Sequence, residues 1–264
     1  MQILPYQGSC SDFYRHTQNV VLKMPMKIWE GNPNRTSLEE TNRKAIEIER
    51  QILQALGNHP RIVPYLGSSS GGILLSEARL GNLQTYIDSH NAELSPSQRS
   101  EICEQVTEGI VHIHKKSVIH SDLRPENILL DLVDASSVSV WLCDFGGSIC
   151  KELGLDGGHL PDTPFFDPRM EWESTPATDI FSLGSIFYTV QTGHWPFRDH
   201  PPQWDSVEEK QAYEAQADSW FKDGHFPPVS HVTGGNVIKG CWNHTYKTAS
   251  EVLKAVRLEM VTPL

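Results

Sequence analysis

The feature that most restricts what this chain can fold into is a polar loop at residues 120–127. In this loop Asp122 and Asn127 stand five positions apart, and an apolar strand expected at 138–142 leads into Asp144-Phe145-Gly146. The side chains of Asp122, Asn127 and Asp144 supply hard oxygen atoms, the ligands that Mg²⁺ prefers while phosphate and water complete its shell. A neighbouring carboxylate can then act as a base on an attacking hydroxyl. The spacing therefore predicts a site for phosphate chemistry.

A helix expected at 37–56 carries a carboxylate in an unusual place. Ser37 and Glu40 form a capping-box pattern that predicts its start, and Gly57 predicts its end. At 100° per residue, four apolar side chains fall within about 60° of Glu49: Ala45, Ile52, Leu53 and Leu56. A carboxylate aimed at the core needs a cationic partner, and Lys23, after the predicted strand 20–22, is the candidate. The alternative is a surface Glu49 that reaches solvent.

The secondary structure expected from the sequence changes near residue 80. Before it, short strands are expected at 20–22, 62–65 and 72–77, around the one helix. After it, the pattern is helical, because Ser95-Pro96 predicts a helix start and apolar residues then recur every three or four positions. Further helices are expected at 178–191 and 248–259. The 264 residues thus predict two lobes, a small β-rich one at 1–78 and a larger helical one at 79–264, with a ligand cleft between them.

The polar loop, the Asp-Phe-Gly and the Lys–Glu pair resemble the eukaryotic protein kinase family, and the resemblance covers nearly the whole chain. It implies an α+β bilobal fold, with Asp122 as the catalytic base and Asn127 and Asp144 as magnesium ligands. It also implies that Lys23 holds the α- and β-phosphates of ATP and that Glu49 pairs with Lys23.

Further residues are assigned by the same resemblance. Arg124-Pro125-Glu126 resembles the Lys-Pro-Glu of Ser/Thr kinases, which adds Arg124 to the expected catalytic set. Asp162-Thr163-Pro164 resembles the Gly-Thr-Pro that shapes the acceptor site, and Asp179 is expected to brace the catalytic loop from beneath. The remaining nucleotide contacts expected from the resemblance are Gly8, Glu77 and Ala78.

Two departures from the family pattern bear on activity. In the place of the glycine-rich loop, residues 6–13 keep only Gly8, and Ser11-Asp12 makes close approach to phosphates harder. Ser121 replaces the Arg that in the family precedes the base and reads a phosphate on the activation loop. Activity is therefore expected not to depend on such a phosphorylation.

A third departure concerns the end of the activation segment. Asp167-Pro168-Arg169-Met170-Glu171 stands where the family has Ala-Pro-Glu, with Glu171 one position late. Lys247 is the expected substitute for the Arg that usually pairs with that Glu, as a weaker point-charge partner.

Charge and composition restrict the classes of molecule that the chain is expected to bind and its expected location. The net charge is −11, from 22 Lys and Arg against 33 Asp and Glu, which argues against a nucleic-acid binder. No apolar run approaches the roughly 18 residues of a membrane span, and no signal-peptide pattern opens the chain. The five cysteines never form a C-x-x-C and are expected to be reduced thiols. We expect an intracellular, cytoplasmic protein without membrane contact, with the nucleus as the alternative.

The function expected from the resemblance is a Ser/Thr protein kinase that transfers the γ-phosphoryl group of Mg-ATP to hydroxyls of a protein substrate. A pseudokinase, which binds nucleotide or partners with little phosphotransfer, is the first alternative, favoured by the poor glycine loop and by Ser121. A small-molecule kinase is the second, because antibiotic-type phosphotransferases share a similar loop.

Overall fold

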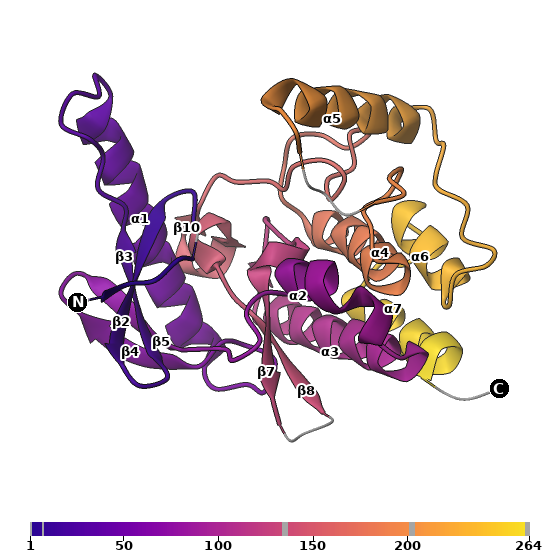
Figure 1. Ribbon diagram of the computed structural model, residues 1–264, viewed down its shortest axis with the longest axis horizontal. Coiled ribbons are helices and arrows are strands. Elements are labelled where there is room, and N and C mark those ends of the chain that lie inside the picture. Colours follow the sequence, from indigo (N-terminus) through magenta and orange to yellow (C-terminus); the bar gives the residue numbers. More distant parts are fainter. Residues whose placement is uncertain (1, 7, 134–136, 201–203, 262–264) are drawn as a thin grey trace.

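A five-stranded antiparallel sheet and one long helix form the N-terminal lobe of the computed structural model, which describes residues 2–6, 8–133, 137–200 and 204–261 (Figure 1). The sheet order is β1-β2-β3-β5-β4. The helix, α1, lies alongside the sheet and turns a buried face toward it. The bounds are β1 Gln2–Ile3, β2 Ser11–Thr17, β3 Val20–Pro25, α1 Arg35–Leu56, β4 Tyr65–Ser69 and β5 Gly72–Ser76.

Helix α1 ends where expected but begins earlier. Gly57 has a φ of 67° and its N–H bonds to the carbonyl of Leu53, so a residue tolerant of positive φ closes the helix. The predicted start at Ser37 is wrong, because the helix begins at Arg35 with Asn34 as its cap residue. A turn centred on Asn32, whose side chain accepts a hydrogen bond from the Asn34 N–H, brings the backbone into the helix before Ser37 is reached.

The strand expected at 62–65 is also displaced. Strand β4 begins only at Tyr65, and Ile62 makes an isolated bridge to Leu142 instead. Pro64 explains the shift, because it has no N–H to donate to a sheet. Its carbonyl still accepts a hydrogen bond from the Ser76 N–H.

Helices dominate the C-terminal lobe, and α4 lies at its centre. Every residue of α4 from Thr178 to Val190 is buried, as expected for a largely apolar helix. Helices α3, α6 and α7 pack around α4, while α5 lies farther out (Figure 1). The helices are α2 Leu83–His90, α3 Pro96–Lys115, α4 Pro176–Thr192, α5 Val207–Lys222, α6 Gly235–Trp242 and α7 Ala249–Val256. The helix expected at 248–259 is therefore shorter, and a π-helical turn at Arg257–Val261 follows it.

Short strands and single helical turns carry the connections of this lobe. Strands β7 and β8 form a hairpin, while β10, β9 and β6 form a small sheet in that order. The strands are β6 Val118–Ile119, β7 Ile128–Leu132, β8 Val138–Leu142, β9 Ile149–Cys150 and β10 Leu155–Asp156. The 3₁₀ turns are η1 Asn91–Glu93, η2 Pro125–Asn127, η3 Phe145–Gly147 and η4 Lys151–Leu153. No helix among the described residues is both long and apolar enough to span a bilayer.

The start of α3 at Ser95-Pro96 is confirmed and gives a stability prediction. The Ser95 hydroxyl accepts a hydrogen bond from the Gln98 N–H, and the Gln98 side chain accepts one from the Ser95 N–H. Ser95→Ala removes a cap of a core helix and is expected to lower the free energy of unfolding by about 1 kcal/mol. Urea denaturation checks this value, and a change in the slope of the transition without a shift of its midpoint would contradict it.

Candidate active site

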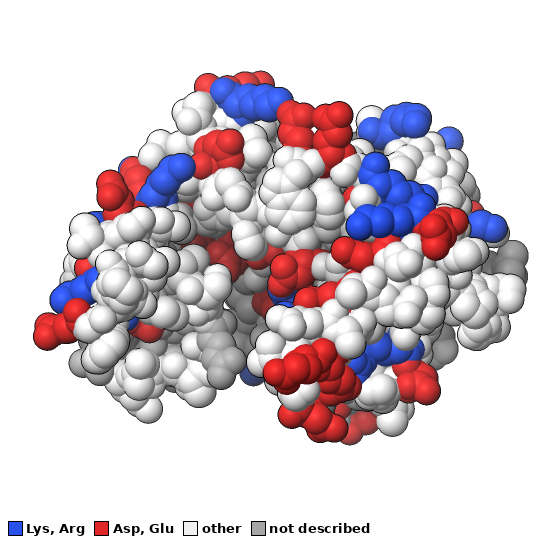
Figure 2. Space-filling view, turned by 90° about the horizontal axis from the view of Figure 1, so that it is seen from above, with Lys and Arg blue, Asp and Glu red and all other residues white. Residues whose placement is uncertain are grey.

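A cleft of about 560 Å³ lies between the two lobes, within the usual range for small-molecule sites. Phe13 and Val21 line it from the N-terminal sheet, and Leu129 of β7 lines it from the other lobe. Its polar end contains Lys23, Glu49, Asn127 and Asp144. Figure 2 shows the hollow between the lobes, with acidic side chains on its inner wall. An apolar slot that ends in charged groups suits a ligand with a flat base and a charged tail.

Lys23 joins the two lobes at this polar end. The residue lies in the middle of β3, and its Nζ donates to Glu49 Oε2 at 2.6 Å and to Asp144 Oδ1 at 2.8 Å. The Lys23 and Glu49 side chains are only 3% and 1% exposed, so the ion pair predicted from the helix face is present and the surface alternative for Glu49 is wrong. Burial of two charges is tolerated here because each has an opposite partner.

The charges of this group depend on one another. Burial would lower the pKa of Lys23, but the adjacent carboxylates of Asp144 and Glu49 outweigh it and raise the pKa above its ordinary value. Burial raises the pKa of Glu49, and the Lys23 charge opposes this shift. For Asp144 burial acts in the same direction, but Lys23 holds the pKa of this carboxyl below its ordinary value. Lys23 is therefore charged and Asp144 is ionised at neutral pH.

The polar loop is held from beneath by Asp179 of α4. Its Oδ2 accepts hydrogen bonds from the His120 N–H at 2.9 Å, and its Oδ1 from the Ser121 N–H at 3.1 Å. His114 Nε2 lies 2.8 Å from Oδ2 as well. Ser121 adopts a positive φ of 67°, and its side chain is fully buried rather than turned toward the activation segment. The brace expected at Asp179 is thus present, while the part played by His114 had no signal in the sequence.

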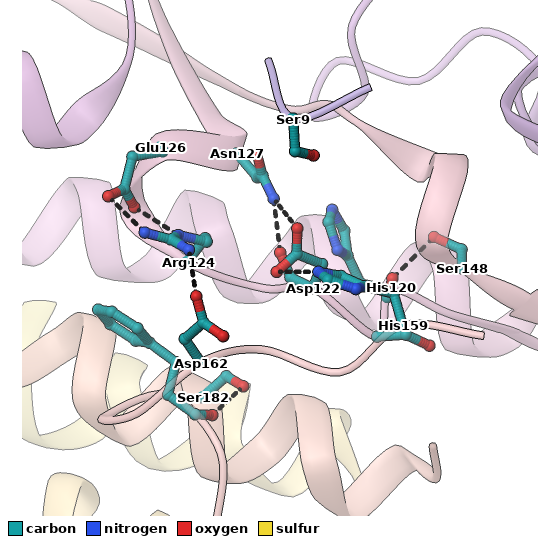
Figure 3. A network of polar contacts seen from close by, with 12 residues as sticks. Ser9, His120, Asp122, Arg124, Glu126, Asn127, Ser148, His159, Asp162 and Ser182 are labelled. Atoms are coloured by element: carbon teal, nitrogen blue, oxygen red, sulfur yellow. Dashed lines mark hydrogen bonds and ion pairs between the residues drawn. The ribbon is translucent and has the colours of Figure 1, made fainter. Parts of the chain in front are cut away.

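Asp122 projects from this loop, and its two carboxylate oxygens face different partners, Asn127 and His159 (Figure 3). The amide nitrogen of Asn127 donates to the Asp122 backbone carbonyl at 2.7 Å and to Asp122 Oδ2 at 2.9 Å. Among the described residues, no hydrogen-bond donor reaches the buried Oδ1. Burial raises the pKa of Asp122, and the nearby His159 and Arg124 oppose this shift. Oδ1 is therefore the carboxylate oxygen to which none of the described residues donates a hydrogen bond.

Two residues suit a magnesium ion at the inner end of the cleft. Asn127 gives its amide nitrogen to Asp122, which turns its amide oxygen away from that carboxylate, and both Asn127 and Asp144 line the cleft. Within the described part of the chain, no group of three or more His, Cys, Asp or Glu forms a ready-made metal cage. One amide and one carboxylate fit Mg²⁺, which keeps water and phosphate among its ligands.

Comparison with known proteins agrees with this geometry. A family model described as "Protein kinase domain" matches residues 7–255. The chain belongs to the protein kinase family. This confirms the family and the bilobal α+β fold expected from the sequence.

Named Ser/Thr kinases are among the relatives of this kinase domain. A probable serine/threonine-protein kinase, gdt4 of Dictyostelium discoideum, is 31% identical over 169 residues, 59% of this chain and 10% of that protein. The phosphorylase b kinase gamma catalytic chain, liver/testis isoform, of Mus musculus is 30% identical over 187 residues, 65% of this chain and 45% of that protein. Serine/threonine-protein kinase RAD53 of Saccharomyces cerevisiae is 31% identical over 180 residues, 59% and 21% respectively. The matched part spans less than half the length of each of these relatives.

In the place of the family's glycine-rich loop, this kinase domain has residues that pack against an aromatic ring and bond to an acidic side chain. A Cβ on Gly8 would lie 3.1 Å from both the Phe13 ring and the Ser11 carbonyl, so the loop packs closely on β2. Tyr6 donates a hydrogen bond to the Glu77 carboxylate at 2.9 Å, and Arg15 forms an ion pair with the same group. Glu77 and Ala78 line the cleft as part of the connection between β5 and α2. Gln7 lies outside the described residues.

On the acceptor side, Arg124 is paired with carboxylates other than Asp122. Its guanidinium bonds to Glu126 at 2.8 Å and lies 3.5 Å from Asp162 (Figure 3). The hydroxyl of Thr163 donates to Asp218 of α5 at 2.5 Å. Sequence reasoning did not find Asp218, which lies 55 positions from Thr163 and outside any motif.

The end of the activation segment is anchored by a different residue from the one expected. Glu171 is exposed, and Lys247 donates to the His244 carbonyl rather than to a carboxylate. The buried acid is Asp167, which pairs with Arg169 at 2.8 Å and with His244 at 2.6 Å. The prediction of a Glu171–Lys247 pair is wrong, because Arg169 folds back onto Asp167 only two positions away and ties it to the α6–α7 connection.

Proposed function

We propose that this protein is a Ser/Thr protein kinase that transfers the γ-phosphoryl group of Mg-ATP to a hydroxyl of a protein substrate. The observation that supports the proposal is one arrangement of charged groups. Lys23 is bonded to Glu49 and Asp144, while Asp122 Oδ1 accepts no hydrogen bond from the described residues. If the charged residues only stabilised the fold, the buried Oδ1 of Asp122 would be expected to have a hydrogen-bond donor, as buried polar atoms usually do.

Each polar residue has a distinct task in this proposal. Lys23, held by Glu49, orients the α- and β-phosphates, and Asn127 and Asp144 hold the metal. When bound, Mg²⁺ supplies positive charge that stabilises the phosphates during transfer. Asp122 Oδ1 orients the acceptor hydroxyl and takes its proton, while the hydrogen bond from Asn127 fixes Oδ2. The Arg124 guanidinium orders the acceptor side through Glu126 and Asp162.

The apolar part of the cleft accounts for the base of the nucleotide. Phe13 and Val21 on one side and Leu129 on the other form a slot for a flat ring. The backbone of Glu77 and Ala78 lies at its edge and offers polar groups to the base. The Glu77 side chain is bonded to Arg15 and Tyr6, and the Glu77 N–H donates to the Asn19 carbonyl, so the Glu77 carbonyl is the group available for this contact.

The alternative is a pseudokinase that binds partners with little transfer. Ser11 and Asp12, at the start of β2 where the family has its glycine-rich loop, favour it, because side chains and a negative charge there oppose close contact with phosphates. The complete set of Lys23, Glu49, Asp122, Asn127 and Asp144 in one cleft favours the active enzyme.

Transfer of γ-labelled phosphate from Mg-ATP to a panel of protein acceptors tests the proposal. We expect wild-type transfer, with Asp122→Asn slower by roughly 10²–10⁴-fold, because the general base is lost. EDTA should abolish the transfer. If wild type and Asp122→Asn give the same background while a nucleotide still raises the melting temperature, the pseudokinase alternative holds.

The class of partner is proposed from the charge of the sequence. With a net charge of −11 we propose a protein acceptor rather than a nucleic acid. The cytoplasmic location stays a prediction, which imaging of the tagged protein would test.

A further inference from the structure

His159 lies beside the free oxygen of Asp122, although no motif of the sequence singles it out. Its Nε2 is 3.6 Å from Asp122 Oδ1, and its side chain is 53% exposed. Figure 3 shows the imidazole reaching the carboxylate from a different side than Asn127. Asp122 is thus contacted on one oxygen by Asn127 and on the other by His159.

The backbone around His159 holds the residue close to the catalytic loop. A Cβ on Gly147 would lie 2.7 Å from the His159 Cβ, so only glycine allows this approach. Gly158 adopts a φ of 67°, and Gly157 donates its N–H to the Ser148 carbonyl at 3.0 Å. On the other side, the Ser174 hydroxyl donates to the His159 carbonyl at 3.3 Å. Two neighbouring segments therefore hold the His159 backbone in place.

The Arg and Lys side chains of the site are paired with carboxylates other than Asp122. Arg124 pairs with Glu126 and Asp162, and Lys23 pairs with Glu49 and Asp144. Among the residues that the structure describes, His159 is the ion-pair partner of Asp122. A contact of 3.6 Å is too long for a hydrogen bond, so the imidazole acts on the carboxylate through its charge when it is protonated.

We infer that His159 is a positioning residue that holds the Asp122 carboxylate toward the incoming acceptor hydroxyl. The inference rests on the proposed phosphotransfer. A cation beside Oδ1 keeps this oxygen on the acceptor side and offsets its repulsion by Asp144 and by the phosphates. Because His159 does not line the nucleotide cleft, its removal affects turnover and not nucleotide binding.

Steady-state kinetics of His159→Gln and His159→Lys test this inference. We expect kcat of His159→Gln to fall about tenfold, with KM for ATP within twofold of wild type, as for a displaced catalytic group. His159→Lys keeps a cation and should stay within about threefold of wild-type kcat. His231→Gln, an exposed histidine in the same lobe, is the matched control and should leave both constants unchanged.

A second measurement tests the contact without any activity. If the ion pair exists, His159→Gln lowers the melting temperature by about 1–2 °C in the wild type and by less in the Asp122→Asn background. Equal shifts in the two backgrounds overturn the inference, as does an unchanged kcat in an active enzyme or a His159→Lys variant as slow as His159→Gln. Absence of wild-type transfer would remove the proposed function, and the two melting shifts would then decide on the contact alone.

Discussion

Replacing Lys23 by Met is expected to remove phosphotransfer and to destabilise the fold at the same time. The Lys23 Nζ bridges the Glu49 and Asp144 carboxylates within 2.8 Å, and its side chain is almost fully buried. Without this cation the buried Glu49 carboxylate and the half-buried Asp144 carboxylate face each other, and breaking a buried pair costs about 3–5 kcal/mol in free energy of unfolding. Loss of the group that orients the phosphates should lower kcat by roughly 10²–10³-fold.

A second substitution separates the two effects. Lys23→Met combined with Glu49→Met replaces both members of the pair by apolar side chains of similar length, which is near neutral for many buried pairs. The double variant should regain much of the lost unfolding free energy and none of the activity. Urea denaturation and the labelled-phosphate assay give the two readouts. A Lys23→Met variant as stable as wild type would show that the pair contributes little to the fold.

The residues around Lys23 could be predicted because each signal is local. The angular position of Glu49 on its helix placed the carboxylate in the apolar stripe, and burial then required a cation. The spacing from Asp122 to Asn127 and the Asp144 motif are likewise properties of short segments. Strand β8 was predicted with its correct bounds, and α4 to within two residues, because both segments are rich in apolar residues that lie close together in the sequence.

What could not be predicted depends on how distant segments meet. His159 reaches Asp122 only because the chain turns at Gly157-Gly158 and passes against Gly147. Asp218 reaches Thr163 from α5, and no periodicity connects the two positions. Even the start of α1 was decided by a side-chain contact of Asn32 outside the helix, which competed with the capping pattern at Ser37. Contacts between distant segments therefore position the residues around Asp122 and Thr163, whereas local sequence patterns predict the residues around Lys23.

Asp167→Asn is the second substitution with a large expected effect. Asp167 is fully buried, and its two oxygens accept hydrogen bonds from Arg169 and from His244. Arg169 also donates to the Trp242 carbonyl at 2.6 Å, so the cluster ties the activation segment to α6. An amide cannot accept hydrogen bonds from both Arg169 and His244 on its two sides, because its NH₂ group would point at a donor. We expect a loss of about 3 kcal/mol in the free energy of unfolding.

The pH dependence of stability distinguishes this ion cluster from ordinary packing. Burial would raise the pKa of Asp167, but the hydrogen bonds from His244 and Arg169 lower it to about 2. A carboxyl with a lowered folded-state pKa stabilises the fold above its unfolded pKa, near 4, and this contribution is lost as the pH falls toward 2. The difference in stability between wild type and Asp167→Asn should therefore be largest at neutral pH and shrink between about pH 5 and pH 2.

Glu171→Gln is the matched control for this experiment, because Glu171 lies four positions away and is exposed. Its effect should stay within about 0.5 kcal/mol at every pH, as for most surface substitutions. If Glu171→Gln proved the more destabilising change, Glu171 and not Asp167 would be the acid that anchors the activation segment. A constant difference between wild type and Asp167→Asn across the acid range would instead mean that shape, and not the charge of Asp167, anchors the activation segment.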